Sequence, residues 1–127
     1  RTIYRGMLIS GLPNMALAFG YVNASWTLKC DLTARNFCRL VNESARHNDA
    51  AFVVPESAQA GERKPMIALD AGYVRRAADI LPMQGSRGGW QVRTDVARDT
   101  LDFHFSPIEK SEVEFRDCPA PPTGAPQ

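Results

Sequence analysis

An apolar run from Met15 to Tyr21 leads through a short polar turn into a longer amphipathic segment. Continuous rather than alternating apolar character is typical of a strand that is buried on both faces, as in a parallel sheet. The following segment, to about Asn42, repeats apolar residues at helical spacing. We therefore expect a strand, a turn and a helix. The first amides of a helix lack internal partners and lie at the positive end of its dipole, so this turn is suited to an anion.

The predicted helix begins after Asn23 or Ser25, which are both favourable N-cap residues. One face of it is expected to pack inward: Trp26, Cys30, Ala34, Phe37, Cys38 and Val41. Because Leu28 and Leu32 lie on the opposite side, the first half is apolar nearly all round. We expect its start to be buried and its C-terminal end to reach water. A buried helix start needs partners for its amides, which either a bound cofactor or a capping side chain would supply.

The rest of the pattern predicts short elements separated by polar loops. Strands are expected within residues 3–9, 51–55 and 113–116, an extended segment at 65–69, a helix at 73–81 and a flexible loop at 84–89. Within residues 95–106, Leu101, Phe103 and Phe105 alternate with Asp102, His104 and Ser106, which is typical of a half-exposed strand. The Pro- and Gly-rich segment from Cys118 onward is expected to be a disordered tail.

Length and charge narrow the class of protein. The 127 residues allow one domain with a modest core. Lys plus Arg number 15 against 14 for Asp plus Glu, and the charges are scattered, which argues against a dedicated nucleic-acid binder. No apolar run approaches the roughly 20 residues that span a bilayer, and there is no signal-peptide pattern. We expect a cytoplasmic protein without a membrane span, and, because the chain opens with Arg1, a fragment of something longer.

The cysteines are expected to be reduced. Cys30 and Cys38 lie eight positions apart on the predicted helix, about 12 Å along its axis, which is beyond the reach of a disulfide. We interpret them as buried thiols, and we expect no metal site, because neither His lies near a Cys.

Few residues indicate catalysis. His104 is interpreted as an ordinary exposed histidine and His47 as a cation beside a helix end. The three carboxylates Asp95, Asp99 and Asp102 are interpreted as a solvated face. The segment Arg87 to Arg93 could touch a phosphate, but we expect it to pack Trp90 onto the body. No arrangement of nucleophile and base is evident, so no catalytic residue is predicted.

The turn before the predicted helix has two interpretations. Gly20 to Ser25 is not the Gly-x-Gly-x-x-Gly fingerprint of dinucleotide-binding proteins, and a purely structural cap fits its spacing. Trp26, in the first helical turn, could stack on a flat ring system or anchor the core.

Longer motifs resemble a known family. The segment YRGMLISGLPNMALAFGYVNASWTLKCDLTARNFCRLVN is similar to the flavin-containing monooxygenases of the Baeyer–Villiger type, and within them to the ethionamide-activating branch. The pattern GxPN, an apolar strand, GYxNASWTLKxDL and CRLxN carries the resemblance. GYVRRAADILPMQGSRGGW and ARDTLDFHF resemble the same branch, so the similarity covers roughly residues 3 to 116.

The resemblance implies both an activity and a fold. FAD, reduced by NADPH, would react with O2 and oxygenate a ketone or a soft heteroatom such as sulfur or nitrogen. The chain would be α/β: residues 1–48 as the C-terminal part of a Rossmann-like FAD-binding domain, 49–117 as a small α+β lobe and 118–127 as the tail. The residues beside the flavin would be Asn23, Ala24, Ser25, Trp26, Thr27 and Leu28.

Other parts of the family pattern are absent from this sequence. The two Gly-rich nucleotide motifs, the Baeyer–Villiger signature and the active-site arginine have no counterpart here. The resemblance therefore implies that the segment alone is inactive and that it associates with the N-terminal part of the enzyme or with its own copy. The alternative is a non-catalytic segment for interaction or assembly.

Overall fold

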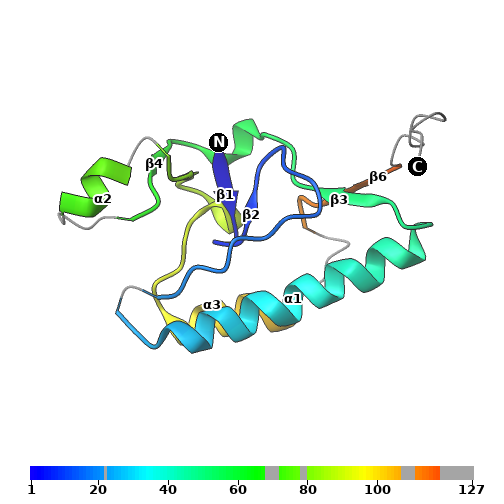
Figure 1. Cartoon of the computed structure of the whole chain (residues 1–127), viewed down its shortest axis with the longest axis horizontal. Helices are drawn as coiled ribbons and strands as arrows, with labels where there is room; N and C mark the ends of the chain where they lie inside the picture. The colour runs from blue at the N-terminus through cyan, green and yellow to red at the C-terminus, as the bar shows by residue number, and fades with distance from the viewer. Residues whose placement is uncertain (22, 68–71, 78–79, 107–110, 118–127) are drawn as a thin grey trace, which may run out of the picture.

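The computed structural model describes residues 1–21, 23–67, 72–77, 80–106 and 111–117. It is a small α/β arrangement in which two helices lie along one side of two short sheets (Figure 1). The helices are α1 (Trp26–Arg46), α2 (Gly72–Ala77) and α3 (Val96–Phe105). The strands are β1 (Thr2–Tyr4), β2 (Leu8–Ile9), β3 (Ala51–Val53), β4 (Lys64–Pro65), β5 (Met83–Gln84) and β6 (Glu114–Arg116). Two single 3-10 turns, η1 (Ala58–Ala60) and η2 (Gly88–Trp90), complete the elements.

The larger sheet has the order β2-β1-β5-β4. Its central pair, β1 and β5, is parallel, and the outer pairs are antiparallel. The smaller sheet pairs β3 with β6, Phe52 opposite Phe115, and confirms the strands predicted at 51–55 and 113–116. Because β1 and β5 pair, residues on either side of position 48 share one sheet. The division at 48 and 117 stays a prediction.

The strand predicted over residues 3–9 is a hairpin. Arg5 and Gly6 both have left-handed backbone conformations, with φ of 50° and 63°, and they turn the chain back on itself. Ile3 then pairs with Ile9.

The strand predicted from Met15 to Tyr21 is wrong. In this segment Ala16 makes a single antiparallel bridge to Leu8, and the Leu17 amide donates to the Met7 carbonyl at 2.7 Å. The run has a neighbour at β2 but no continuous ladder, and Met15 remains 40% exposed. Ala16 packs against the core and Tyr21 is buried, so the run contacts the core without being a strand of either sheet.

Helix α1 confirms the predicted helix and extends it to Arg46, with His47 as its C-cap. The predicted inner face is wrong except at Phe37, which is partly buried and packs against Phe52 of the core. The buried residues are Lys29, Leu32, Thr33, Asn36 and Leu40. Trp26 is 53% exposed and Cys38 is exposed, so the expected buried thiol is also wrong at Cys38, while Cys30 is half-buried. The helix turns Lys29 inward because Asp99 compensates its charge.

The predicted strand near residues 101–106 is wrong, because this segment is helix α3. Asp95 is its N-cap, and its carboxylate accepts from the amides of Ala97 and Arg98. In a helix, residues four apart share a face. Asp99 and Phe103 therefore face inward together, while Leu101 and Phe105 share another face and are 54% and 74% exposed. Asp99 is 2% exposed, which contradicts its interpretation as part of a solvated face.

The remaining expectations have mixed outcomes. The loop predicted at 84–89 is wrong in part, because Gln84 belongs to β5 and Gly88 begins η2. The helix predicted at 73–81 is present in part, as α2, which ends at Ala77; Ile80, expected inside, lies in a turn and is 85% exposed. Residues 68–69 of the extended segment, 78–79 of the helix, and the tail with Cys118 lie outside the described residues.

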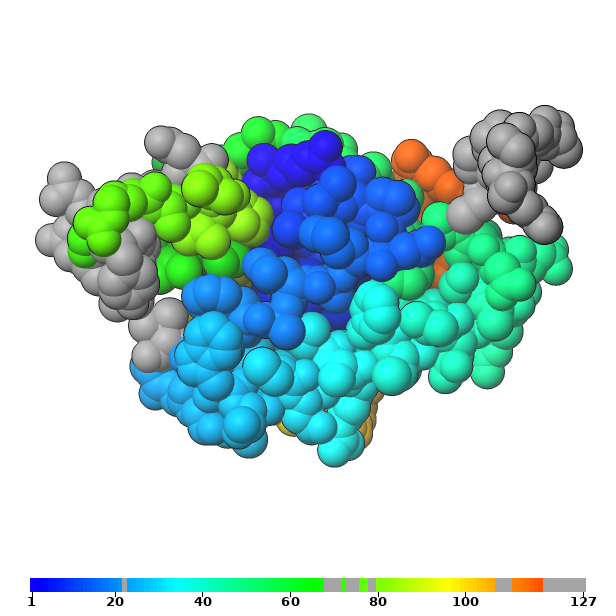
Figure 2. All heavy atoms as spheres, viewed as in Figure 1, coloured from blue at the N-terminus to red at the C-terminus, as the bar shows by residue number. Residues whose placement is uncertain are grey.

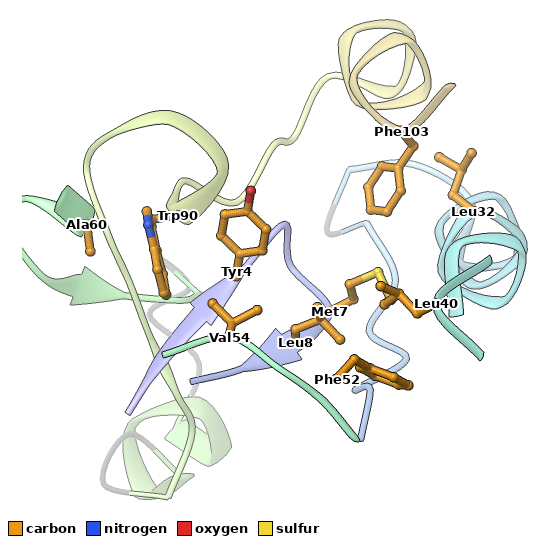
Figure 3. Close-up of a cluster of buried hydrophobic side chains, with 10 residues drawn as sticks. All are labelled: Tyr4, Met7, Leu8, Leu32, Leu40, Phe52, Val54, Ala60, Trp90 and Phe103. Carbon is orange, nitrogen blue, oxygen red and sulfur yellow. The ribbon is translucent and has the colours of Figure 1, made fainter. Parts of the chain in front are cut away.

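The core lies between the larger sheet and helices α1 and α3 (Figure 3). Trp90 packs against Tyr4 at one end, and Phe103 lies beside Leu32 at the other. The cluster consists of Tyr4, Met7, Leu8, Leu32, Leu40, Phe52, Val54, Ala60, Trp90 and Phe103. It fixes α1 and α3 side by side, with both helices starting at the same end of the molecule (Figure 1).

Candidate functional site: a groove at the start of α1

An apolar groove of about 260 Å³ lies between the segment preceding α1 and the segments around residues 66 and 92. Its walls include Phe19, Gly20, Tyr21, Asn23, Lys29, Met66, Gln84 and Val92. Small-molecule sites commonly measure about 300–1,000 Å³. The groove therefore has room for one flat ring system or one end of a dinucleotide, and not for a whole dinucleotide.

Helix α1 begins at the rim of this groove without a side-chain cap. Ser25 is the N-cap residue, but its hydroxyl shares a 2.8 Å hydrogen bond with the Thr27 hydroxyl instead of accepting from an amide. The first turn contains no acidic residue. Among the described contacts, no side chain accepts from the amides of Trp26 and Thr27. These amides can donate to an acceptor from outside the chain.

The structure separates the six predicted site residues. Asn23 lines the groove, while Ala24 is half-buried and the remaining four, Ser25, Trp26, Thr27 and Leu28, are exposed. The prediction that this end of the helix is buried is therefore wrong, because residues 25–28 are exposed. That these six residues contact a flavin stays a prediction.

Trp26 bridges the rim and the groove wall. Its ring lies 5.1 Å from that of Phe19 between centroids, at 50°. A Cβ at Gly20 would collide with the Trp26 ring, so this approach requires glycine. Trp26 is thus not a core anchor, and its ring borders the groove through Phe19.

A buried charged cluster lies behind the groove. Lys29 Nζ is 2.6 Å from Asp99 Oδ2, and the Tyr21 hydroxyl donates to the same oxygen at 2.6 Å. The side chains of Lys29 and Asp99 are 4% and 3% exposed. The ammonium also lies 4.4 Å from the centroid of Phe103, a cation–π distance. The cluster ties the segment before α1 and α1 itself to α3.

Burial governs the ionisation of this cluster. Burial lowers the pKa of Lys29, and the hydrogen bond and charge of Asp99 oppose that shift. Burial, followed by the hydrogen bond to Asp99, raises the pKa of Tyr21 above its ordinary value. Tyr21 is therefore a neutral hydrogen-bond donor at neutral pH.

Sequence reasoning missed Lys29, Tyr21 and Asp99 as a unit. The available signal was a lysine within the apolar start of α1, together with an aspartate four residues before Phe103 on what proves to be a helix. An ion pair between two elements distant in sequence leaves no spacing pattern in either of them.

The other candidate residues behave as ordinary structural groups. Trp90 is 1% exposed and its Nε1 donates to Glu112 at 2.9 Å, which confirms that its segment packs onto the body. His104 is exposed as predicted, and His47 ends α1. Within the described ranges, no three His, Cys, Asp or Glu side chains gather closely enough to hold a metal ion.

Comparison with known proteins identifies relatives over nearly the whole chain. The FAD-containing monooxygenase EthA of Mycobacterium tuberculosis is 40% identical over 118 residues, which is 93% of this chain. The probable FAD-binding monooxygenase AlmA of Acinetobacter baylyi is 40% identical over 115 residues, or 89% of the chain. The putative FAD-containing monooxygenase MymA of M. tuberculosis is 37% identical over 114 residues, or 88%. The chain is a homologue of the FAD-containing monooxygenases.

The resemblance in the sequence is thereby confirmed, and its extent is limited. The chain spans about a quarter of the length of these relatives, 24% of EthA and 23% of AlmA and MymA. No family profile matches the chain, and no solved structure is similar to it at a significant level. None of the helices in the described part of the chain combines the length and the hydropathy needed to cross a membrane.

Proposed function

We propose that this chain is the C-terminal, FAD-contacting region of an NADPH-dependent flavin monooxygenase that oxygenates ketones or soft heteroatoms. The observation that carries the proposal is the uncapped start of α1 at the rim of an apolar groove, in a chain homologous to FAD-containing monooxygenases. On this proposal the segment before α1 and α1 belong to a Rossmann-like FAD domain of a cytoplasmic enzyme.

The residues at the rim fit a flavin. Unpaired amides of Trp26 and Thr27 would donate to electron-rich oxygens, Asn23 would add an amide group, and the Phe19 wall would contact a flat ring. The volume of about 260 Å³ fits the ring end, so the rest of FAD would be held by other parts of the enzyme. Bound FAD would supply the redox and oxygen-activating chemistry, while this chain binds and orients it.

The exposed side of α1 carries apolar residues that favour an interface with another polypeptide. Trp26, Leu28 and Val41 are 53%, 48% and 46% exposed, and α1 runs uncovered along one edge of the molecule (Figure 2). Exposed apolar side chains on one helix are typical of a surface that meets another polypeptide. We propose that the N-terminal part of the enzyme, or a second copy, covers it, and that the isolated chain is inactive.

The test is FAD binding and coupling in the intact protein. Trp26→Ala should weaken FAD retention and uncouple NADPH oxidation from O2-dependent product formation, because it removes the ring that orders the rim. The matched control is Arg35→Ala, further along the exposed side of α1, which should change neither. If the intact protein shows no flavin absorbance after incubation with FAD, the proposal fails and the assembly interpretation stands.

A second measurement tests the isolated chain. Purified residues 1–127, supplied with FAD, NADPH and a ketone or thioether, should form no oxygenated product. Coupled NADPH oxidation by this chain alone would contradict the assignment of catalysis to the other parts of the enzyme.

A further inference from the structure

We infer that Lys29 is a ligand-binding residue of the groove, a fixed cation that favours the reduced, more electron-rich state of the flavin ring. The inference rests on the proposed function, since it takes the flavin ring as the occupant. The groove also has Arg93 in its wall, but Arg93 is paired with Asp102 at 3.1 Å; the exposed surface of the remaining walls is mainly apolar.

The end of the Lys29 side chain lies at the wall of the groove. Lys29 lines the groove, and so does Gly6. A Cβ built on Gly6 would lie 3.5 Å from both Cε and Nζ of Lys29, so the end of the lysine side chain adjoins the groove wall. Gly6 therefore leaves the ammonium close to the groove, where a larger residue would screen it.

The Lys29 ammonium group makes two hydrogen bonds to the described residues. An ammonium group has three donors. One meets Asp99 at 2.6 Å, and a second meets the Arg5 carbonyl at 3.4 Å. The third has no acceptor among the described residues, and an acceptor oxygen of a ligand in the groove could complete the set.

Asp99, the counter-charge of Lys29, is not part of the groove wall. It lines a neighbouring hollow with Arg5 and Asp102, and Arg93 lies in the wall of both the hollow and the groove. A ligand in the groove is consequently nearer to the cation than to its counter-charge. Reduction of a flavin adds negative charge to its ring oxygens and nitrogens, so this asymmetry stabilises the reduced form.

The test is the reduction potential of FAD bound to the intact protein. Lys29→Met/Asp99→Asn removes both charges without leaving a buried carboxylate unpaired. It should weaken binding of reduced FAD relative to oxidised FAD by about tenfold, a fall of about 30 mV for two electrons. Asp99→Asn alone removes the counter-charge and one of the groups that sustain the ammonium, so at the lower end of the pH range, where Lys29 is protonated, it should shift the potential upward.

The two variants are expected to shift the reduction potential in opposite directions, which distinguishes an electrostatic role of Lys29 from a purely structural one. A lost packing contact would move both variants in the same direction or leave the potential unchanged. The control is Asp31→Asn/Arg35→Met, which removes an exposed ion pair from the same helix and should leave the potential unchanged. If both cluster variants bind FAD at the wild-type potential, the inference is overturned while the proposed function stands. If the wild-type protein binds no FAD, the proposed function itself fails.

Discussion

The two long helices start side by side, and their first turns are built in opposite ways. Helix α3 begins with Asp95, whose carboxylate accepts from the amides of Ala97 and Arg98. Helix α1 begins with Ser25, whose hydroxyl caps no amide. One helix satisfies its own start, whereas the other leaves donors at the rim of a groove. The amides at the start of α1 are therefore free to meet an acceptor from outside the chain, whereas those of α3 are satisfied by its own N-cap side chain.

The charged residues near the two helix starts also differ: one suits the helix dipole and the other opposes it. Asp99 lies in the first turn of α3, where a negative charge complements the helix dipole. Lys29 lies near the start of α1, where a positive charge opposes it. The 2.6 Å ion pair between them offsets this cost and joins the helices. Helix α1 therefore depends on α3 for the charge that compensates Lys29.

The largest expected effect comes from breaking that dependence. Lys29→Met leaves the Asp99 carboxylate buried without its counter-charge and should lower the free energy of unfolding by about 3–5 kcal/mol. Urea denaturation of the intact protein measures it. Lys29→Met/Asp99→Asn should recover most of the loss, and Arg35→Met, in an exposed pair of the same helix, should change little. Equal losses in the single and double variants would show that the charges are not the cause.

The next effect comes from the hydroxyl that shares Asp99 with Lys29. Tyr21→Phe removes a hydrogen bond to a charged group and should cost about 1.5–3 kcal/mol at neutral pH. Because the pKa of Tyr21 is raised, the folded protein keeps this proton at pH values where the unfolded chain loses it. The contribution is complete below the unfolded pKa of about 10 and is lost as the pH rises above it.

The stability difference between wild type and Tyr21→Phe should therefore shrink above about pH 10. Denaturation curves at a series of alkaline pH values measure this difference. A difference that stays constant through that range would exclude the Tyr21 hydroxyl as its source.

Substitutions at the two N-cap residues should change the free energy of unfolding by smaller amounts, and by different amounts at the two helices. Asp95→Ala should cost about 1 kcal/mol, because two amides of α3 lose their acceptor. Ser25→Ala should leave the free energy of unfolding nearly unchanged, because its hydroxyl caps nothing. Thermal or urea unfolding of both variants checks the comparison, and a loss at Ser25 as large as that at Asp95 would remove the distinction between the two starts.

The sequence predicted the long helix, the strands near residues 51 and 115 and the burial of Trp90, because each is specified by local pattern. It failed for α3, where Leu101, Phe103 and Phe105 alternate as in a strand. In a short segment such alternation does not distinguish strand from helix, and the N-cap Asp95 was the signal that favoured the helix. It failed for Met15 to Tyr21 because a strand requires continuous partners, which apolar composition does not supply.

The site was predictable only in part. The turn before α1 and the family resemblance predicted a site from Asn23 to Leu28, and the structure places Asn23 in the groove; that these residues contact a flavin stays a prediction. The inner face of α1 was not predictable, since it depends on Asp99, 70 residues away, which makes a buried lysine tolerable. The groove itself is assembled from Gly6, Met66, Gln84 and Val92, which no motif connects.

The most direct test of the proposed contact between the start of α1 and the flavin is FAD affinity in Ser25→Asp, compared with Ser25→Asn as a neutral control of the same size. Either side chain can cap the open amides, but only aspartate adds a negative charge where an electron-rich ring is proposed to bind. Equilibrium titration of the intact protein should show about tenfold weaker FAD binding for Ser25→Asp and a smaller loss for Ser25→Asn, corresponding to a difference on the order of 1 kcal/mol. Wild-type affinity in a folded Ser25→Asp protein would contradict the claim that the start of α1 faces the flavin.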